Sequence, residues 1–97
     1  MKFEKKVEIA KKRGYELITK EELAKRIGED LWIAYGCVQC GRAYGEKDFT
    51  EILYVIFPEN YDEREAQELF GVIGGSIKYG IIAKCKYCGH SEVYTDW

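Results

Sequence analysis

The chain has 97 residues, of which a third are charged and 46% hydrophobic, and its formal net charge is −2. This balance is typical of one small globular domain and excludes a disordered segment. No apolar run approaches the ~20 residues that a membrane helix needs, and the charged start leads into no signal-peptide core, so we expect a cytoplasmic protein without membrane partners. The small net charge also excludes a globally basic nucleic-acid binder.

The charges are unevenly distributed along the chain. Residues 1–26 carry four more basic than acidic residues, whereas residues 46–70 carry six more acidic than basic ones. Such opposed blocks could steer a partner, but neither is a run of one sign, so we expect them to attract each other within the fold. The scarcity of Asn, Gln and Met beside eleven Lys resembles heat-adapted proteins and predicts a thermophilic source.

The first 28 residues are predicted to form a helical part. Phe3, Val7 and Ala10 give one apolar stripe of a helix over residues 2–13, which Gly14 would end. A short extended link over residues 15–18 follows. Thr19 and Glu22 have capping-box spacing, and they predict a second short helix that stops at Gly28.

The rest of the chain, residues 31–97, is predicted to be rich in strands. Residues 31–35 lead into Cys37, and residues 43–44 leave Cys40 as a second strand. The continuous apolar run 52–57 predicts a strand covered on both faces. Asn60 and Glu63 predict the start of a helix near 61–70. After a turn at 74–75, a strand at 77–83 should run into Cys85, with residues 92–95 as its return strand. The expected fold class is α+β.

All four cysteines occur in two matched pairs, and each pair is followed by glycine. Cys37 and Cys40 frame the first C-x-x-C-G sequence, and Cys85 and Cys88 frame the second. Glycine permits the positive φ that such a turn needs, and four thiolates can surround zinc at ~2.3 Å. We therefore predict a structural metal site with these four ligands. Two disulfides in a heat-adapted protein, or four buried thiols, are the alternatives.

The two C-x-x-C-G turns resemble the paired knuckles of zinc-ribbon and rubredoxin-like proteins. Tyr44, four residues after Cys40, also suits the rubredoxin pattern. The resemblance covers residues 32–46 and 79–95. It implies Cys37, Cys40, Cys85 and Cys88 as ligands, antiparallel β hairpins around them, and Zn or alternatively Fe as the ion. Residues 48–76 would form an inserted strand–helix unit that packs beside the ribbon.

Other motifs in the chain are weaker. His90 could be a spare ligand, but with four thiolates present we expect it beside the site or on the surface. Residues 2–28 resemble the first part of a helix-turn-helix domain, but no recognition helix follows Gly28, which favours a packing helix. The sequence contains no phosphate-binding loop, no HExxH motif and no nucleophile elbow, so we expect a non-enzymatic protein without a small-molecule substrate.

Aromatic and basic residues alternate on and beside the knuckles, in a pattern that could grip a nucleic-acid backbone and stack bases. They are Tyr35, Arg42, Tyr44, Lys84, Lys86, Tyr87 and His90. The alternative is that the tyrosines cover the metal and the lysines maintain solubility. Three functions therefore remain open: a zinc module that contacts nucleic acid or transcription machinery, a zinc-held surface for a protein partner, and a rubredoxin-like iron electron carrier.

Overall fold

A computed structural model describes residues 1–28, 34–74 and 77–96 of the chain. Three α-helices, α1 (Phe3–Lys12), α2 (Lys20–Ile27) and α3 (Glu63–Leu69), accompany six strands. The strands are β1 (Glu16–Ile18), β2 (Ala34–Cys37), β3 (Phe49–Ile56), β4 (Ile73–Gly74), β5 (Lys78–Cys85) and β6 (Val93–Asp96). A short 3-10 helix, Glu46–Asp48, precedes β3. This mixed α and β content confirms the coarse fold prediction.

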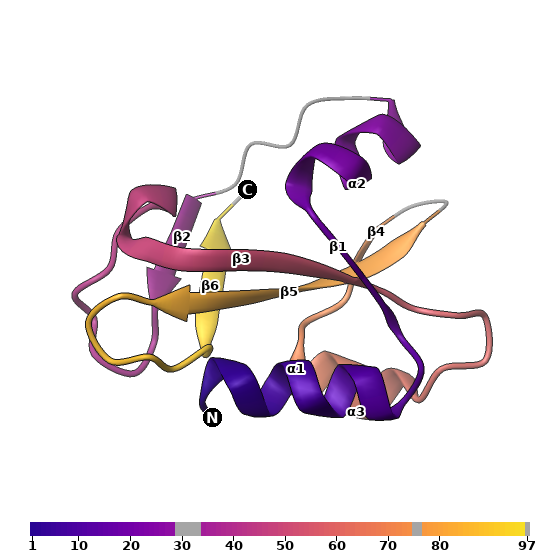
Figure 1. Cartoon of the computed structure of the whole chain (residues 1–97), viewed down its shortest axis with the longest axis horizontal. Coiled ribbons are helices and arrows are strands. Elements are labelled where there is room, and N and C mark those ends of the chain that lie inside the picture. The colour runs from indigo at the N-terminus through magenta and orange to yellow at the C-terminus, as the bar shows by residue number, and fades with distance from the viewer. Residues whose placement is uncertain (29–33, 75–76, 97) are drawn as a thin grey trace.

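The strands form two antiparallel sheets. The larger sheet has the order β1-β3-β5-β4, and β2 pairs with β6 in a separate two-stranded sheet. Figure 1 shows α1 and α3 side by side below the large sheet, with α2 above it and the small sheet at the end where the two cysteine turns lie. No helix in the described ranges is long and apolar enough to cross a membrane.

Alternation along β3 and β5 supplies a core on each face of the large sheet. Tyr54 and Ile81 point into the core shared with α2 and the cysteines. Val55 and Ile82 point into the core shared with α1 and α3. All four side chains are buried. The prediction that the apolar run 52–57 is a strand covered on both faces is therefore confirmed.

The helix boundaries follow the predicted caps closely, with one correction. The hydroxyl of Thr19 accepts a hydrogen bond from the Glu22 amide, and Gly28 ends α2 with a φ of 74°. The cap of α3, however, is Asp62 rather than Asn60, because the Asp62 carboxylate accepts the Glu65 amide at 3.1 Å. Both residues are good caps, and the helix begins two residues later than the pattern suggested.

The pairing of the strands around the cysteines differs from the predicted hairpins. Residues 43–44 are not a strand, and β6 pairs with β2 rather than returning along β5. Beyond the short pairing with β4, the Ala83 amide donates to the Ser91 side chain and the Cys85 amide to the His90 carbonyl, so β6 does not pair along this edge of β5. Within the predicted insertion, β3 pairs with β5, the strand that leads into Cys85, and lies in the middle of the large sheet.

Candidate metal centre

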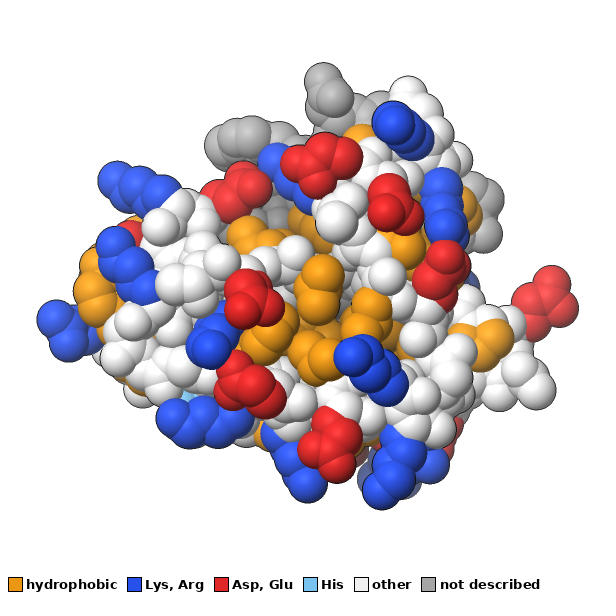
Figure 2. All heavy atoms as spheres, viewed as in Figure 1, with side chains coloured by type: hydrophobic (Ala, Val, Ile, Leu, Met, Phe, Trp, Pro, Cys, Tyr) orange, Lys and Arg blue, Asp and Glu red, His pale blue; other side chains and the backbone are white. Residues whose placement is uncertain are grey.

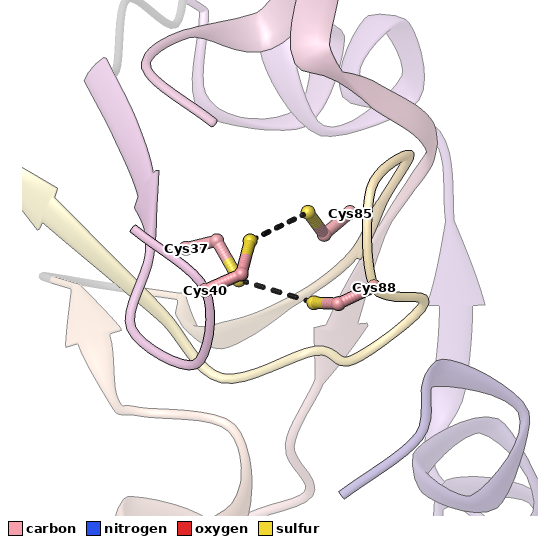
Figure 3. A group of neighbouring side chains, drawn as sticks. All are labelled: Cys37, Cys40, Cys85 and Cys88. Carbon is pink, nitrogen blue, oxygen red and sulfur yellow. Dashed lines mark hydrogen bonds between the residues drawn. The ribbon is translucent and has the colours of Figure 1, made fainter. Parts of the chain in front are cut away.

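The two cysteine turns meet where the large sheet and the small sheet come together. Cys37 ends β2 and Cys85 ends β5, while Cys40 and Cys88 lie in the turns that follow. Figure 3 shows the four side chains pointing toward one another from two separate loops. Their Sγ atoms all lie within 4.8 Å of one another. The residues predicted as ligands thus form one cluster.

The two turns repeat the same local backbone structure. The amide of Gly41 donates to the carbonyl of Cys37 at 3.1 Å, and the amide of Gly89 donates to the carbonyl of Cys85 at 2.9 Å. Both glycines have positive φ, 66° for Gly41 and 72° for Gly89. A side chain is strained in this conformation, so glycine after each second cysteine lets the turn close around a central point.

The sulfur positions fit a tetrahedral ion. The Sγ atoms of Cys37 and Cys88 are 3.5 Å apart, and those of Cys40 and Cys85 are 3.7 Å apart. A regular tetrahedron with metal–sulfur bonds of ~2.3 Å has sulfur–sulfur edges of ~3.8 Å. A disulfide would need about 2.05 Å, and the four cysteines are free. The cluster can therefore hold a metal ion, whereas the disulfide alternative does not describe this structure.

Burial makes the cluster a poor place for thiolates that lack a counter-ion. Cys37 and Cys85 are buried, and Cys40 and Cys88 are half-buried. Burial, with further contributions from the adjacent sulfurs, raises the pKa of the Cys88 thiol to about 12. A bound divalent cation reverses this preference, because coordination deprotonates a thiol outright. Cys88 is therefore a neutral thiol in the absence of a metal and would become a thiolate when it coordinates one.

Asp48 fastens the two turns to each other. Its carboxylate accepts the Tyr44 amide at 3.0 Å and contacts the Lys86 ammonium at 3.3 Å. The Lys86 amide donates to the Asp48 carbonyl at 3.1 Å. The Tyr44 amide, followed by Lys86, holds the pKa of this carboxyl below its usual range. Asp48 was not among the predicted site residues. It stands just before a β-branched and aromatic run, and nothing in that pattern indicates that it would contact the cysteine turns.

The residues predicted to contact nucleic acid are only partly brought together. Arg42 and Lys86 both lie over the Tyr87 ring, 4.8 Å and 5.1 Å from its centroid. Tyr44 lies in the same region with 75% of its surface exposed. Lys84 differs, because its ammonium contacts Glu4 of α1 at 2.7 Å. Tyr35 belongs to β2, but its side chain lies outside the described structure.

His90 lies beside the cluster but is not part of it. The group that can hold a metal among the described residues consists of the four cysteines alone. The carbonyl of His90 accepts the Cys85 amide at 3.2 Å, and its ring nitrogen Nδ1 lies 3.6 Å from a Glu92 carboxylate oxygen. The residue therefore supports the second turn through its backbone.

Comparison with known proteins places the chain in no family. No protein-family model, no curated protein and no solved structure matches it. The resemblance of the two turns to zinc-ribbon knuckles is thus confined to the local sequence and geometry, and the arrangement of the strands around them differs from the paired hairpins that it implied.

Proposed function

We propose that the chain is a non-catalytic module built around a structural zinc ion held by Cys37, Cys40, Cys85 and Cys88. The observation that carries this proposal is the convergence of four sulfur atoms, all within 4.8 Å of one another. Four thiolates fill a tetrahedral ion and leave no open position for a substrate or water. Zinc suits this donor set, and a reducing cytoplasm would keep the thiols available.

The ion would add to the bonds through Asp48 that already join the two turns. It would join the end of β2 to the end of β5, and the small sheet to the large one. Structural zinc in finger peptides has an apparent binding free energy of ~10–16 kcal/mol, part of which becomes folding stability. For a domain of this size, that contribution is comparable to the whole stability of a typical protein.

Metal analysis of protein purified under reducing conditions tests this proposal. We expect one zinc per chain and a large fall in melting temperature after chelation. Material that contains stoichiometric iron and absorbs visible light would support the electron-carrier alternative instead. A chain that stays cooperatively folded after chelation, with no stoichiometric metal before it, would contradict both.

We further propose that the face over the two turns binds single-stranded nucleic acid. This knuckle surface comprises Val38, Arg42, Tyr44, Lys86 and Tyr87. Three of the four exposed large hydrophobic side chains in the described residues belong to it: Val38, Tyr44 and Tyr87. Figure 2 shows hydrophobic side chains flanked by Lys and Arg at the end of the molecule that carries the turns. Exposed rings beside cations suit base stacking with phosphate contacts.

Fluorescence anisotropy with labelled single-stranded RNA and DNA tests the second proposal. Tyr44→Ala should weaken binding by about five- to 150-fold, since stacking on one aromatic contributes roughly 1–3 kcal/mol, and Arg42→Ala should also weaken it through the loss of a cation. Lys84→Ala is the matched control, because this lysine is occupied by Glu4. Binding should weaken steeply with salt. A metal-loaded protein that binds neither polymer at low salt would contradict the proposal and would favour a protein partner for this surface.

A further inference from the structure

A cavity of about 390 Å³ lies beside the edge of β5 that β4 leaves uncovered. Its wall is formed by the end of α3 and the following residues, one side chain of α1, and the segment that leads into β6. The lining residues used below are Lys6, Phe70, Val72, Ile81, Ser91 and Val93. Its volume falls within the usual range for small-molecule sites.

Lys6 is the unusual member of this lining. Only 5% of the residue is exposed, although lysine is almost never fully buried without a partner. Its ammonium donates to the Ser91 carbonyl at 3.0 Å, and no carboxylate of the described residues lies within ion-pair distance of it. Burial lowers the pKa of Lys6 to about 8. A buried cation without a counter-ion is costly, so its retention needs an explanation.

The acidic residues of the lining do not supply that counter-ion. Glu68 lies 3.9 Å from Arg64, and Glu92 contacts the Met1 nitrogen and the ring of His90. Lys6 is therefore the one charged group of the lining without an oppositely charged neighbour in the described part of the chain. Because Arg64 and the Met1 nitrogen balance the two carboxylates of the lining, the protonated Lys6 ammonium is the unbalanced charge that an anion would meet.

The rest of the lining restricts what kind of anion fits. Gly71 and Val72 also line the cavity. Phe70, Ile81 and Val93 add apolar surface. One cation suits a monoanion better than a phosphate, which usually recruits several positive groups. Apolar walls suit a short hydrocarbon body.

We propose that this cavity binds a small organic monocarboxylate whose carboxylate pairs with the Lys6 ammonium. The short apolar part of the acid lies against Phe70, Ile81 and Val93. This proposal does not depend on the metal centre or on the knuckle surface, because none of the four cysteines lines the cavity. Binding and metal content can therefore be measured separately.

Titration of the metal-loaded protein with butyrate, followed by amide chemical shifts, tests the proposal. Butyramide is the matched neutral probe, and inorganic phosphate tests for general anion binding. We expect saturable shifts with butyrate at residues around Phe70 and Ser91, and at least about tenfold weaker binding of both other probes, since a hydrogen bond to a charged group contributes roughly 1.5–3 kcal/mol. Equal binding of butyramide, or no saturation with butyrate, would overturn the proposal.

Two variants separate the site from the fold. Lys6→Met should weaken butyrate binding by at least about tenfold while the far-ultraviolet spectrum and zinc content stay unchanged. Val72→Phe leaves Lys6 in place and fills the half-open cavity, so it should also abolish binding. If Lys6→Met fails to fold, Val72→Phe still decides the question. Undiminished binding by a folded Val72→Phe variant would contradict the proposal.

Discussion

The Sγ atom of Cys40 lies 3.7 Å from that of Cys85, although 45 residues separate them in the chain. Each of the two cysteine turns holds two ligands, so the loss of any one sulfur should disable the whole centre. We expect Cys85→Ser to lose stoichiometric metal and at least about 3 kcal/mol of stability. That loss corresponds to a fall in melting temperature of about 12 °C or more.

The matched control for this cysteine variant is Val38→Ala, which changes an exposed side chain in the turn between Cys37 and Cys40. It should keep its metal and melt within a few degrees of the wild type. Metal content and thermal unfolding, each with and without chelator, provide the measurement. A Cys85→Ser variant that melts like the wild type would show that the ion is not structural.

Gly80 is required by the close approach of β5 to the end of α3. A Cβ atom at this position would lie 2.6 Å from Cβ of Phe70 and 2.7 Å from the carbonyl oxygen of Gly71. We expect Gly80→Ala to cost about 1–3 kcal/mol, the usual range for an overpacked core. Gly45→Ala is the control, because its backbone is extended and its Cβ would meet nothing within 4 Å. Urea unfolding gives the free energy of unfolding of both variants. Equal values for Gly80→Ala and Gly45→Ala would contradict the close approach at Gly80.

The cap of α3 can be tested at two neighbouring positions. Asp62→Ala removes the acceptor of the Glu65 amide and should cost about 1 kcal/mol. Asn60→Ala changes an exposed residue outside the helix and should cost less than about 0.5 kcal/mol. Denaturant midpoints give both values. A larger loss for Asn60→Ala than for Asp62→Ala would show that Asn60 is the cap, as the sequence pattern predicted.

Asp48 should make the link between the two turns sensitive to acid. The pKa of this carboxyl is lowered from 3.8 by the Tyr44 amide and by Lys86, so its stabilising effect is present above pH 4 and is lost as the pH falls below that value. Asp48→Asn should therefore show a flatter loss of stability below pH 4 than the wild type. Both proteins lose metal as their thiolates are protonated, so the comparison isolates Asp48. Parallel acid-unfolding curves would contradict this role.

Lys6 should give a second rise of stability with pH, at the alkaline end of the range. Burial lowers its pKa from 10.5 to about 8, so between these values the unfolded chain holds a proton that the folded chain has released. Stability should then rise with pH across this window, by on the order of 3 kcal/mol for a shift of this size. The rise should be absent in Lys6→Met. Urea midpoints at several pH values between 7.5 and about 11 give the measurement.

Local signals in the sequence predicted most of the elements. Apolar stripes and glycine stops located α1 and α2, and the run 52–57 located a two-sided strand, because these patterns reflect burial on one face or on two. The paired C-x-x-C-G turns indicated the cluster of four sulfurs, since their spacing fits a tetrahedral ion and no cysteine is left over.

Contacts between segments that are distant in the sequence could not be predicted from these local patterns. The pairing of β6 with β2, and the hydrogen bond from the Ala83 amide to the Ser91 side chain, join segments that alternation within the strands does not relate. Lys6 occurs on a lysine-rich helix, where periodicity alone places lysine in solvent, and only the packing of α1 against Ser91 buries it. The ion pair between Lys84 and Glu4 likewise joins distant segments, and it occupies one of the residues expected to bind nucleic acid.

The separation of the two cysteine pairs also bears on when the proposed metal site could form during synthesis. β3 can pair with β1 as soon as it is made, but its other neighbour, β5, comes later, and the fourth sulfur, at Cys88, follows Cys40 by 48 residues. At the usual pace of a ribosome the interval is about 2–10 s. During those seconds Cys37 and Cys40 are two thiols without the other half of their cage, exposed to oxidants and to stray metals. The proposed metal site could therefore be completed only after Cys88 has emerged, and the ions present around the chain at that moment would bear on which one is captured.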